Sequence, residues 1–80
     1  MTLDDLPFRT PATVTSVSWA TLPERDARRL RDLGLDEGVR IEALHGGWIG
    51  RDPLAVKIGR MTVAIRRANA RAVLVEEATA

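Results

Sequence analysis

The amino-acid sequence predicts a mainly β protein, a small closed barrel of five short strands with one short α-helix after the first strand. Short runs of alternating or β-branched residues, separated by turn-forming residues, favour strands. Residues 24–33 instead have helical spacing and a strong helix-end signal. With 80 residues, 45% of them apolar and 29% charged, the chain makes one domain over residues 1–80. Its core is thin, because a domain this small buries little more than about 60% of its unfolded surface.

The first strand is predicted at residues 13–19, which are rich in β-branched side chains. Its alternation slips between Val14 and Val17, as a β-bulge would cause. Trp19 stands at the end of this strand, and we expect it to pack in the core.

The helix is predicted to begin at a capping box formed by Thr21 and Glu24 and to run to Leu33. In a capping box the threonine oxygen accepts from the backbone N–H three residues later, and the glutamate carboxylate reaches back to the threonine N–H. Ala27, Leu30 and Leu33 are expected to point inward. Glu24, Arg28 and Asp32 are spaced four apart on the exposed side.

The end of the helix carries the clearest local signal in the chain. Gly34 falls where a helix ends with positive φ, a conformation that is costly for any residue with a Cβ. Leu35 follows at the position that packs back onto Leu30. The pattern predicts a Schellman cap.

The second half of the sequence reads as strands and turns. Apolar and polar residues alternate in most of it, and glycines or short polar stretches separate the runs. We expect a strand at 39–43, an irregular loop at 45–53, a hairpin of strands 54–58 and 61–65 with a type II′ turn at Gly59 and Arg60, a short turn at 68–70 and a closing strand at 73–75.

The loop at 45–53 contains two features of interest. Its glycines are expected to supply positive-φ positions in a wide hairpin. Trp48 and Ile49 follow two of these glycines. They are expected either to fold back onto the barrel, covering a thin core, or to be offered to a partner as an apolar anchor.

Groups that carry catalysis or bind metals are scarce. The chain has no cysteine, which excludes disulfides, thiolate metal sites and a cysteine nucleophile. His45 is the single histidine, and no nucleophile motif surrounds it. The nearest carboxylates, Glu42 and Asp52, do not have a metal-ligand spacing. We therefore expect no enzyme, no cofactor and no dedicated metal site.

The formal net charge is only +1, but residues 51–71 carry six basic residues against one acidic residue, Asp52. This segment is expected to be a solvated face with the acidic ends of the chain folded over it, or a docking face for an acidic protein surface or lipid headgroups. It contains no aromatic residue on which bases could stack, so nucleic-acid binding is not favoured.

The beginning of the chain is acidic and lacks the apolar stretch of a signal peptide. No apolar run approaches the ~20 residues that a membrane span needs. We expect a cytoplasmic protein that does not insert directly into the membrane.

Four stretches together resemble the FeoA family. Residues 29–38 (RLRDLGLDEG) are similar to its R-L-x-x-L-G-[FLI]-x-P-G stretch, with Glu37 where proline is usual. Residues 50–54 (GRDPL) are similar to its G-D-P-[LIV], with one residue inserted. Residues 58–67 (IGRMTVAIRR) and 70–75 (ARAVLV) resemble its G-x-x-[LIV]-[AS]-[LI]-R-R hairpin and its A-x-x-[IV]-x-V closing strand.

The resemblance implies an SH3-like barrel that serves as a small accessory protein of ferrous iron uptake. It implies a partner as well, the FeoB-type membrane permease, through its cytoplasmic GTP-binding domain or its membrane core. The residues that we expect to bind this partner are Arg25 and Arg29 on the helix and Trp48, Ile49 and Arg51 in the loop. The apolar pair would anchor, and the arginines would orient against carboxylates.

Two other functions stay open from the sequence. One is a metal-responsive regulatory domain, because metalloregulator repressors carry a similar barrel at their C-terminus. The other, less favoured, is a small barrel that binds nucleic acid. The sequence leaves the oligomeric state undetermined.

Overall fold

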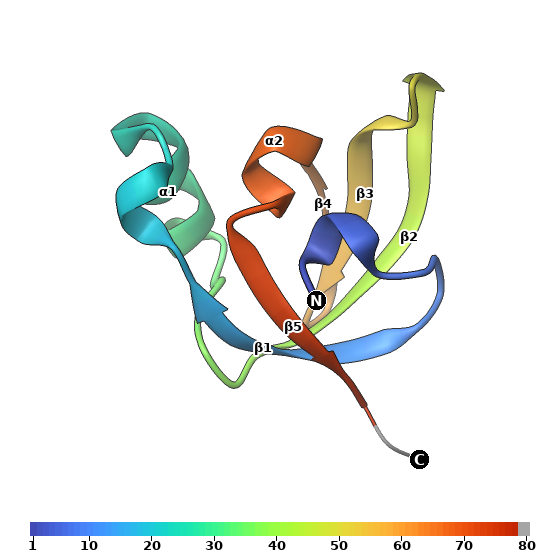
Figure 1. Ribbon diagram of the computed structural model, residues 1–80, viewed down its shortest axis with the longest axis horizontal. Coiled ribbons are helices and arrows are strands. Elements are labelled where there is room, and N and C mark those ends of the chain that lie inside the picture. Colours follow the sequence, from blue (N-terminus) through green and yellow to red (C-terminus); the bar gives the residue numbers. More distant parts are fainter. Residues whose placement is uncertain (79–80) are drawn as a thin grey trace.

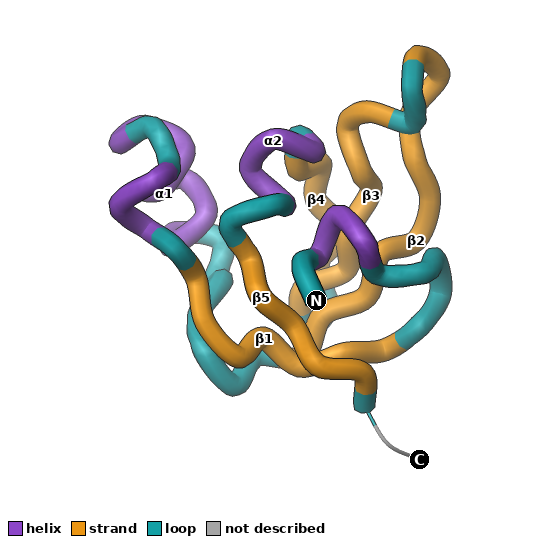
Figure 2. Tube along the Cα trace, viewed as in Figure 1, coloured by secondary structure: helices purple, strands orange, loops and turns teal. Residues whose placement is uncertain are grey.

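The computed structural model describes residues 1–78, except for the side chains of Trp48 and Ile49. It contains five strands, two α-helices and two short 3-10 helices (Figures 1 and 2). In chain order these are η1 (Leu3–Asp5), β1 (Pro11–Val17), η2 (Trp19–Thr21), α1 (Glu24–Asp32), β2 (Arg40–Ile49), β3 (Asp52–Ile58), β4 (Met61–Ile65), α2 (Arg67–Ala70) and β5 (Val73–Glu77).

The five strands form one antiparallel sheet in the order β4-β3-β2-β1-β5. The sheet curls around a single core, so the mainly β fold with a short helix after the first strand is confirmed (Figure 1). Full closure by strand pairing is not seen in residues 1–78, because no ladder joins β4 to β5. The chain instead passes between these two strands through α2, which packs against β3 and η1.

The inward faces follow the predicted alternation. Leu54, Val56 and Ile58 of β3 are buried, as is Ile65 of β4, because every second side chain of a strand points to the same face. Val63 is partly buried and packs against the same core. The largest fully buried side chains are Leu3, Leu30, Leu35, Ile41, Leu54, Ile65, Val14, Val56 and Val73.

The first strand begins two residues earlier than expected and ends at Val17. The predicted bulge is confirmed, since the register between β1 and β5 shifts between Val14 and Ser16. Trp19 lies after the strand, in η2, and is only partly buried. It packs against the core on one side and lies under the guanidinium of Arg31, whose Cζ is 4.5 Å from the ring centroid.

The predicted capping box is wrong. Thr21 is the last residue of η2, and its Oγ1 donates to the carbonyl of Ser18 at 2.8 Å. Because Thr21 belongs to this 3-10 turn, it does not stand at the N-cap, and α1 begins only at Glu24, with Pro23 as its N-cap residue. The carbonyl of Pro23 then accepts the first helical bond, from the N–H of Ala27 at 2.9 Å.

The Schellman cap at the end of α1 is confirmed. The N–H of Leu35 donates to the carbonyl of Leu30 at 3.0 Å, and the N–H of Gly34 donates to that of Arg31 at 3.0 Å. Gly34 has φ +93°. Leu30 and Leu35 are both fully buried, so the cap also fixes α1 against the core.

The hairpin predicted at 45–53 is present, but paired strands take the place of most of the expected irregular loop. β2 continues to Ile49, and β3 resumes at Asp52 after a two-residue turn (Figure 1). Gly50 and Arg51 make this turn with φ +62° and +56°, as a type I′ turn requires. The second hairpin agrees with prediction, because Gly59 has φ +60° and Ile58 pairs with Met61.

Gly46 and Gly47 are required for a different structural reason from the positive φ that was predicted. Neither has positive φ. A Cβ on Gly46 would lie 2.6 Å from the carbonyl oxygen of Arg51, and one on Gly47 would lie 2.6 Å from that of Asp52. These glycines are needed because the two strands approach each other closely.

Arg67 joins three segments of the chain. Its Nη1 lies 2.6 Å from Oδ1 of Asp4 in η1, and its Nε donates to the carbonyl of Arg51 at 3.0 Å. Its backbone N–H donates to Oδ1 of Asp52 at 3.1 Å. Asp4 also accepts from Nε of Arg71 at 3.3 Å, and its side chain is only 17% exposed. η1, the β2–β3 hairpin and α2 are thereby held together.

We predict that Asp4→Ala lowers the free energy of unfolding by about 1–2 kcal/mol, since it removes two charge-assisted hydrogen bonds from a partly buried carboxylate. Urea unfolding would measure the loss. Arg28→Ala is the matched control, because its pair with Glu24 spans 3.7 Å between exposed side chains. That change should cost less than about 0.5 kcal/mol. Equal losses from both variants would contradict the assignment.

We predict that Gly47→Ala destabilises the protein by about 2 kcal/mol, because its Cβ would overlap the backbone of the opposite strand. Gly50→Ala measures the cost of positive φ alone, because a Cβ at Gly50 would have no atom of a non-neighbouring residue within 4 Å. Its cost should be about 1 kcal/mol. Thermal unfolding of both variants would show which loses more stability. If Gly47→Ala were as stable as the unaltered protein, the two strands could not approach as closely as described.

Candidate functional site

One hollow of the surface brings together two arginines of α1 and one that directly precedes α2. It lies between α1 and the end of β4 and has a volume of about 480 Å³. Three arginines and one carboxylate contribute to its wall. We call it the arginine hollow; it is lined by Arg25, Asp26, Arg29, Pro53, Ala64, Arg66 and Asn69.

The helix α1 places two of these arginines. Arg25 and Arg29 are four residues apart, so they share one face of the helix. Ala27 and Leu30 are buried and fix the opposite side. Nη2 of Arg29 donates to the carbonyl of Ala64 in β4 at 3.1 Å, which spans the hollow.

The arginines of the hollow have no carboxylate partner among residues 1–78. The ion pairs in this part of the chain involve Arg28, Arg67 and Arg71 instead. Asp26 lines the same hollow but forms none of these pairs. Guanidinium groups in such a place can receive a carboxylate or phosphate through two parallel hydrogen bonds.

Arg51 lies on a separate surface, at the tip of the β2–β3 hairpin. It is exposed, and its Cζ is 5.7 Å from the ring centroid of Phe8. The side chains of Trp48 and Ile49 lie outside the described residues, so their predicted role stays a prediction. The structure therefore brings Arg25 and Arg29 together but does not place Arg51 with them.

Sequence reasoning missed Arg66 and Asn69 as members of this surface. Arg66 was visible only as part of the basic stretch 51–71. Within that stretch Arg67 and Arg71 are paired with Asp4, as expected for an acidic end folded over it. Arg66 has no such pair among the described residues and faces the hollow, which only the position of α1 could reveal.

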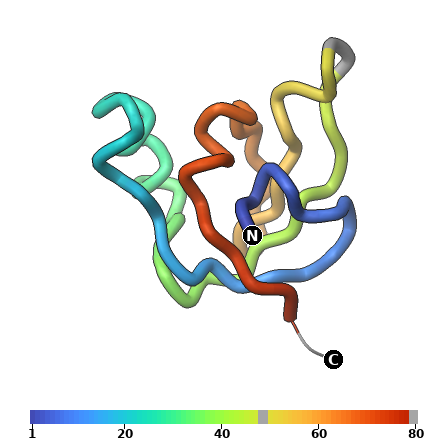
Figure 3. The backbone as a smooth tube through the Cα atoms, viewed as in Figure 1, coloured from blue at the N-terminus to red at the C-terminus, as the bar shows by residue number. Residues whose placement is uncertain are grey.

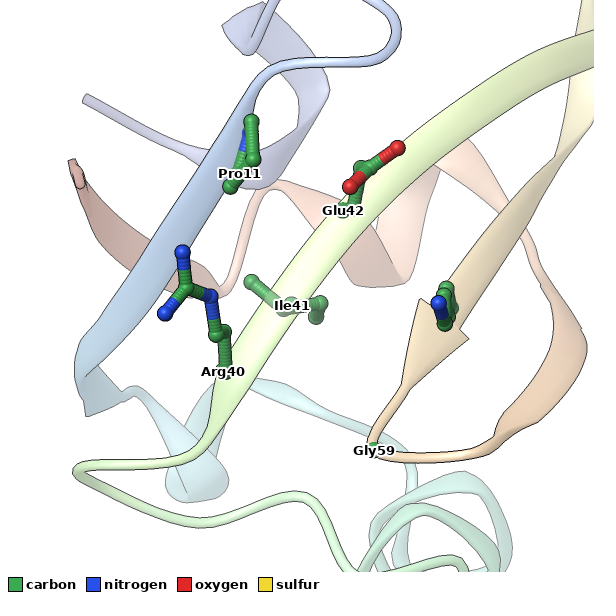
Figure 4. Close-up of a pocket in the computed structure, with 6 residues that line it drawn as sticks. Pro11, Arg40, Ile41, Glu42 and Gly59 are labelled. Atoms are coloured by element: carbon green, nitrogen blue, oxygen red, sulfur yellow. The ribbon is translucent and has the colours of Figure 1, made fainter. Parts of the chain in front are cut away.

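Three other hollows are each lined by at most one arginine. The one in Figure 4 lies between β1, β2 and the β3–β4 turn, with Arg40 and Glu42 of β2 extending beside Pro11. Its volume is about 170 Å³, below the roughly 300–1,000 Å³ of typical ligand sites. Another hollow, of about 490 Å³, is lined in part by the stacked pair Trp19 and Arg31.

Within residues 1–78, no three side chains of the His, Asp and Glu types come together as a metal site would require. His45 is exposed, and its Nδ1 lies 3.5 Å from the carbonyl of Gly46. Neither described helix has the length and apolar character of a membrane span.

Comparison with known proteins agrees with this fold. The FeoA domain model matches residues 1–77. The crystal structure of Stenotrophomonas maltophilia FeoA complexed with zinc is 38% identical, with a TM-score of 0.80 over 95% of this chain and 89% of that one. It is described as a prokaryotic SH3 domain protein and is suggested to be a ferrous iron transport activating factor.

Two solution structures are similar as well. The FeoA protein of Chlorobium tepidum is 33% identical, with a TM-score of 0.85 over 99% of this chain and 71% of that one. The iron(II) transport protein A of Clostridium thermocellum is 26% identical, with a TM-score of 0.82 over 96% of this chain and 45% of that one. No curated protein sequence matches the chain. The family match over nearly all of the sequence, together with these SH3-like neighbours, establishes that the chain belongs to the FeoA family.

Proposed function

We propose that this protein is a cytoplasmic accessory protein of ferrous iron uptake that acts by docking to the FeoB-type permease, without catalysis of its own. The association of the family with ferrous iron transport supports the first part. The arginine hollow supports the second, because it offers a partner three guanidinium groups that have no carboxylate of their own among residues 1–78.

The chemistry of the hollow favours an acidic protein surface. Arginine presents a planar set of donors that matches a carboxylate, and it loses less on desolvation than lysine does. Complementary charge across an interface speeds encounter and fixes orientation. Arg25 and Arg29 would hence orient the docked partner, while Arg66 strengthens the local field.

The hairpin tip is the second contact in this proposal. Arg51 holds φ +56°, in the left-handed region that glycine adopts at no steric cost. Backbone strain of this kind is found preferentially at functional positions. The expected anchors Trp48 and Ile49 precede it in the same hairpin.

We predict that Arg25→Glu combined with Arg29→Glu weakens docking at least tenfold, because attraction to carboxylates becomes repulsion. Titration calorimetry with the cytoplasmic domain of the permease would measure the affinity. Arg40→Glu is the control, since it makes the same kind of charge change at an exposed position of β2 outside the hollow. Equal weakening by the control would mean that only net charge matters.

The role of Arg51 is tested by two substitutions that both remove its guanidinium. Arg51→Gly should be more stable than Arg51→Ala by about 1 kcal/mol, because alanine keeps the positive-φ cost and glycine does not. Both should weaken docking alike. If both variants bind the permease domain as the unaltered protein does, Arg51 takes no part in docking.

A further inference from the structure

The two edge strands of the sheet differ in whether another part of the chain covers them. The outer edge of β5 is covered by the N-terminal residues, which run beside it (Figure 3). The N–H of Val75 donates to the carbonyl of Met1 at 2.8 Å, and Thr2 forms a bridge with Leu74. The edge of β4 has no such cover among residues 1–78, since β4 pairs only with β3.

The hairpin register shows which backbone groups of β4 face this open edge. Ile58 and Met61 close a two-residue turn and therefore exchange hydrogen bonds with each other. Antiparallel pairs alternate, so Thr62 and Ala64 direct their N–H and C=O groups away from β3. The bond from Arg29 to the carbonyl of Ala64 confirms this direction. The N–H and C=O of Thr62 and the N–H of Ala64 have no backbone partner in the described part of the chain.

Two hollows flank this edge and differ in chemistry. The arginine hollow adjoins Ala64 and opens toward α1. A further hollow, of about 390 Å³, is lined mostly by small or apolar residues of β2, β3 and β4, together with His45 and Thr62. A strand laid beside β4 would carry its side chains alternately to opposite faces of the sheet. Ala64 lines both hollows, so an extended segment laid along β4 would pass beside both, and acidic residues on it would meet the arginines.

The charges at the edge decide between a second copy of this chain and a different partner. Pairing of two β4 edges would bring Arg29, Arg60 and Arg66 of one copy toward the same residues of the other. Like charges across strands are destabilising. An acidic partner segment would instead be attracted by these arginines.

We propose that β4 accepts an extended acidic segment of the docking partner as a sixth strand, a mode that rests on the proposed function. Thr62 and Ala64 supply the backbone hydrogen bonds. Arg29 gives up the carbonyl of Ala64 to an N–H of the incoming strand. Its guanidinium then joins those of Arg25 and Arg66 on the carboxylates of the segment. Arg29 thus protects the edge while the partner is absent.

The test is Thr62→Pro, with the cytoplasmic domain of the permease as the probe. Proline removes the N–H that the incoming strand needs, while the fold loses no ladder bond, because this N–H faces outward. Thr62→Ala is the matched control, since it also removes the threonine side chain but keeps the N–H. We expect at least a tenfold loss of affinity for Thr62→Pro and none for Thr62→Ala. Equal affinities of the two variants would overturn strand addition and leave docking intact.

Amide hydrogen exchange of the unaltered protein gives a readout that does not depend on folding of the proline variant. We expect the amides of Thr62 and Ala64 to exchange fast alone and at least tenfold more slowly in the complex. Unchanged exchange in a formed complex would overturn the proposal. Slow exchange that sedimentation assigns to a dimer of this chain would also overturn it. If the unaltered protein does not bind the permease domain at all, both the proposed function and this inference fail.

Discussion

The contacts of Arg67 hold the architecture together. The sheet does not close by hydrogen bonding between β4 and β5, so the barrel depends on what bridges that gap. Arg67 begins the helix that does so, and it binds Asp4 from the start of the chain as well as Arg51 and Asp52 from the hairpin turn. One side chain and its amide thereby substitute for a missing strand ladder. The carboxylate and carbonyl partners also compensate for the cost of partly burying a guanidinium.

Sequence reasoning succeeded where the physics is local. The Schellman cap could be predicted because positive φ at Gly34 and the contact of Leu35 with Leu30 involve residues that are close in the chain. The alternation of Leu54 with Val56 could be predicted because the period of a strand is fixed. The clustering of Arg25 with Arg29 follows likewise from helix geometry.

Sequence reasoning failed for features that depend on residues far apart in the chain or on a neighbouring turn. Thr21 lies in the 3-10 turn before the helix, where its hydroxyl donates to the carbonyl of Ser18, and it does not cap α1. Gly46 and Gly47 resemble turn residues, but the opposing backbone of Arg51 and Asp52 explains them. Arg66 belongs to the arginine hollow only because α1, from another part of the chain, packs beside it. No local pattern encodes such a placement.

The close approach of β2 and β3 near Gly46 and Gly47 has a consequence for recognition. Two backbones in such contact have few alternative arrangements, and Arg67 also holds the hairpin turn through its bonds to Arg51 and Asp52. A partner that meets this hairpin therefore has little chain entropy left to remove from it. The glycines, which make no recognition contacts of their own, would contribute to affinity through rigidity.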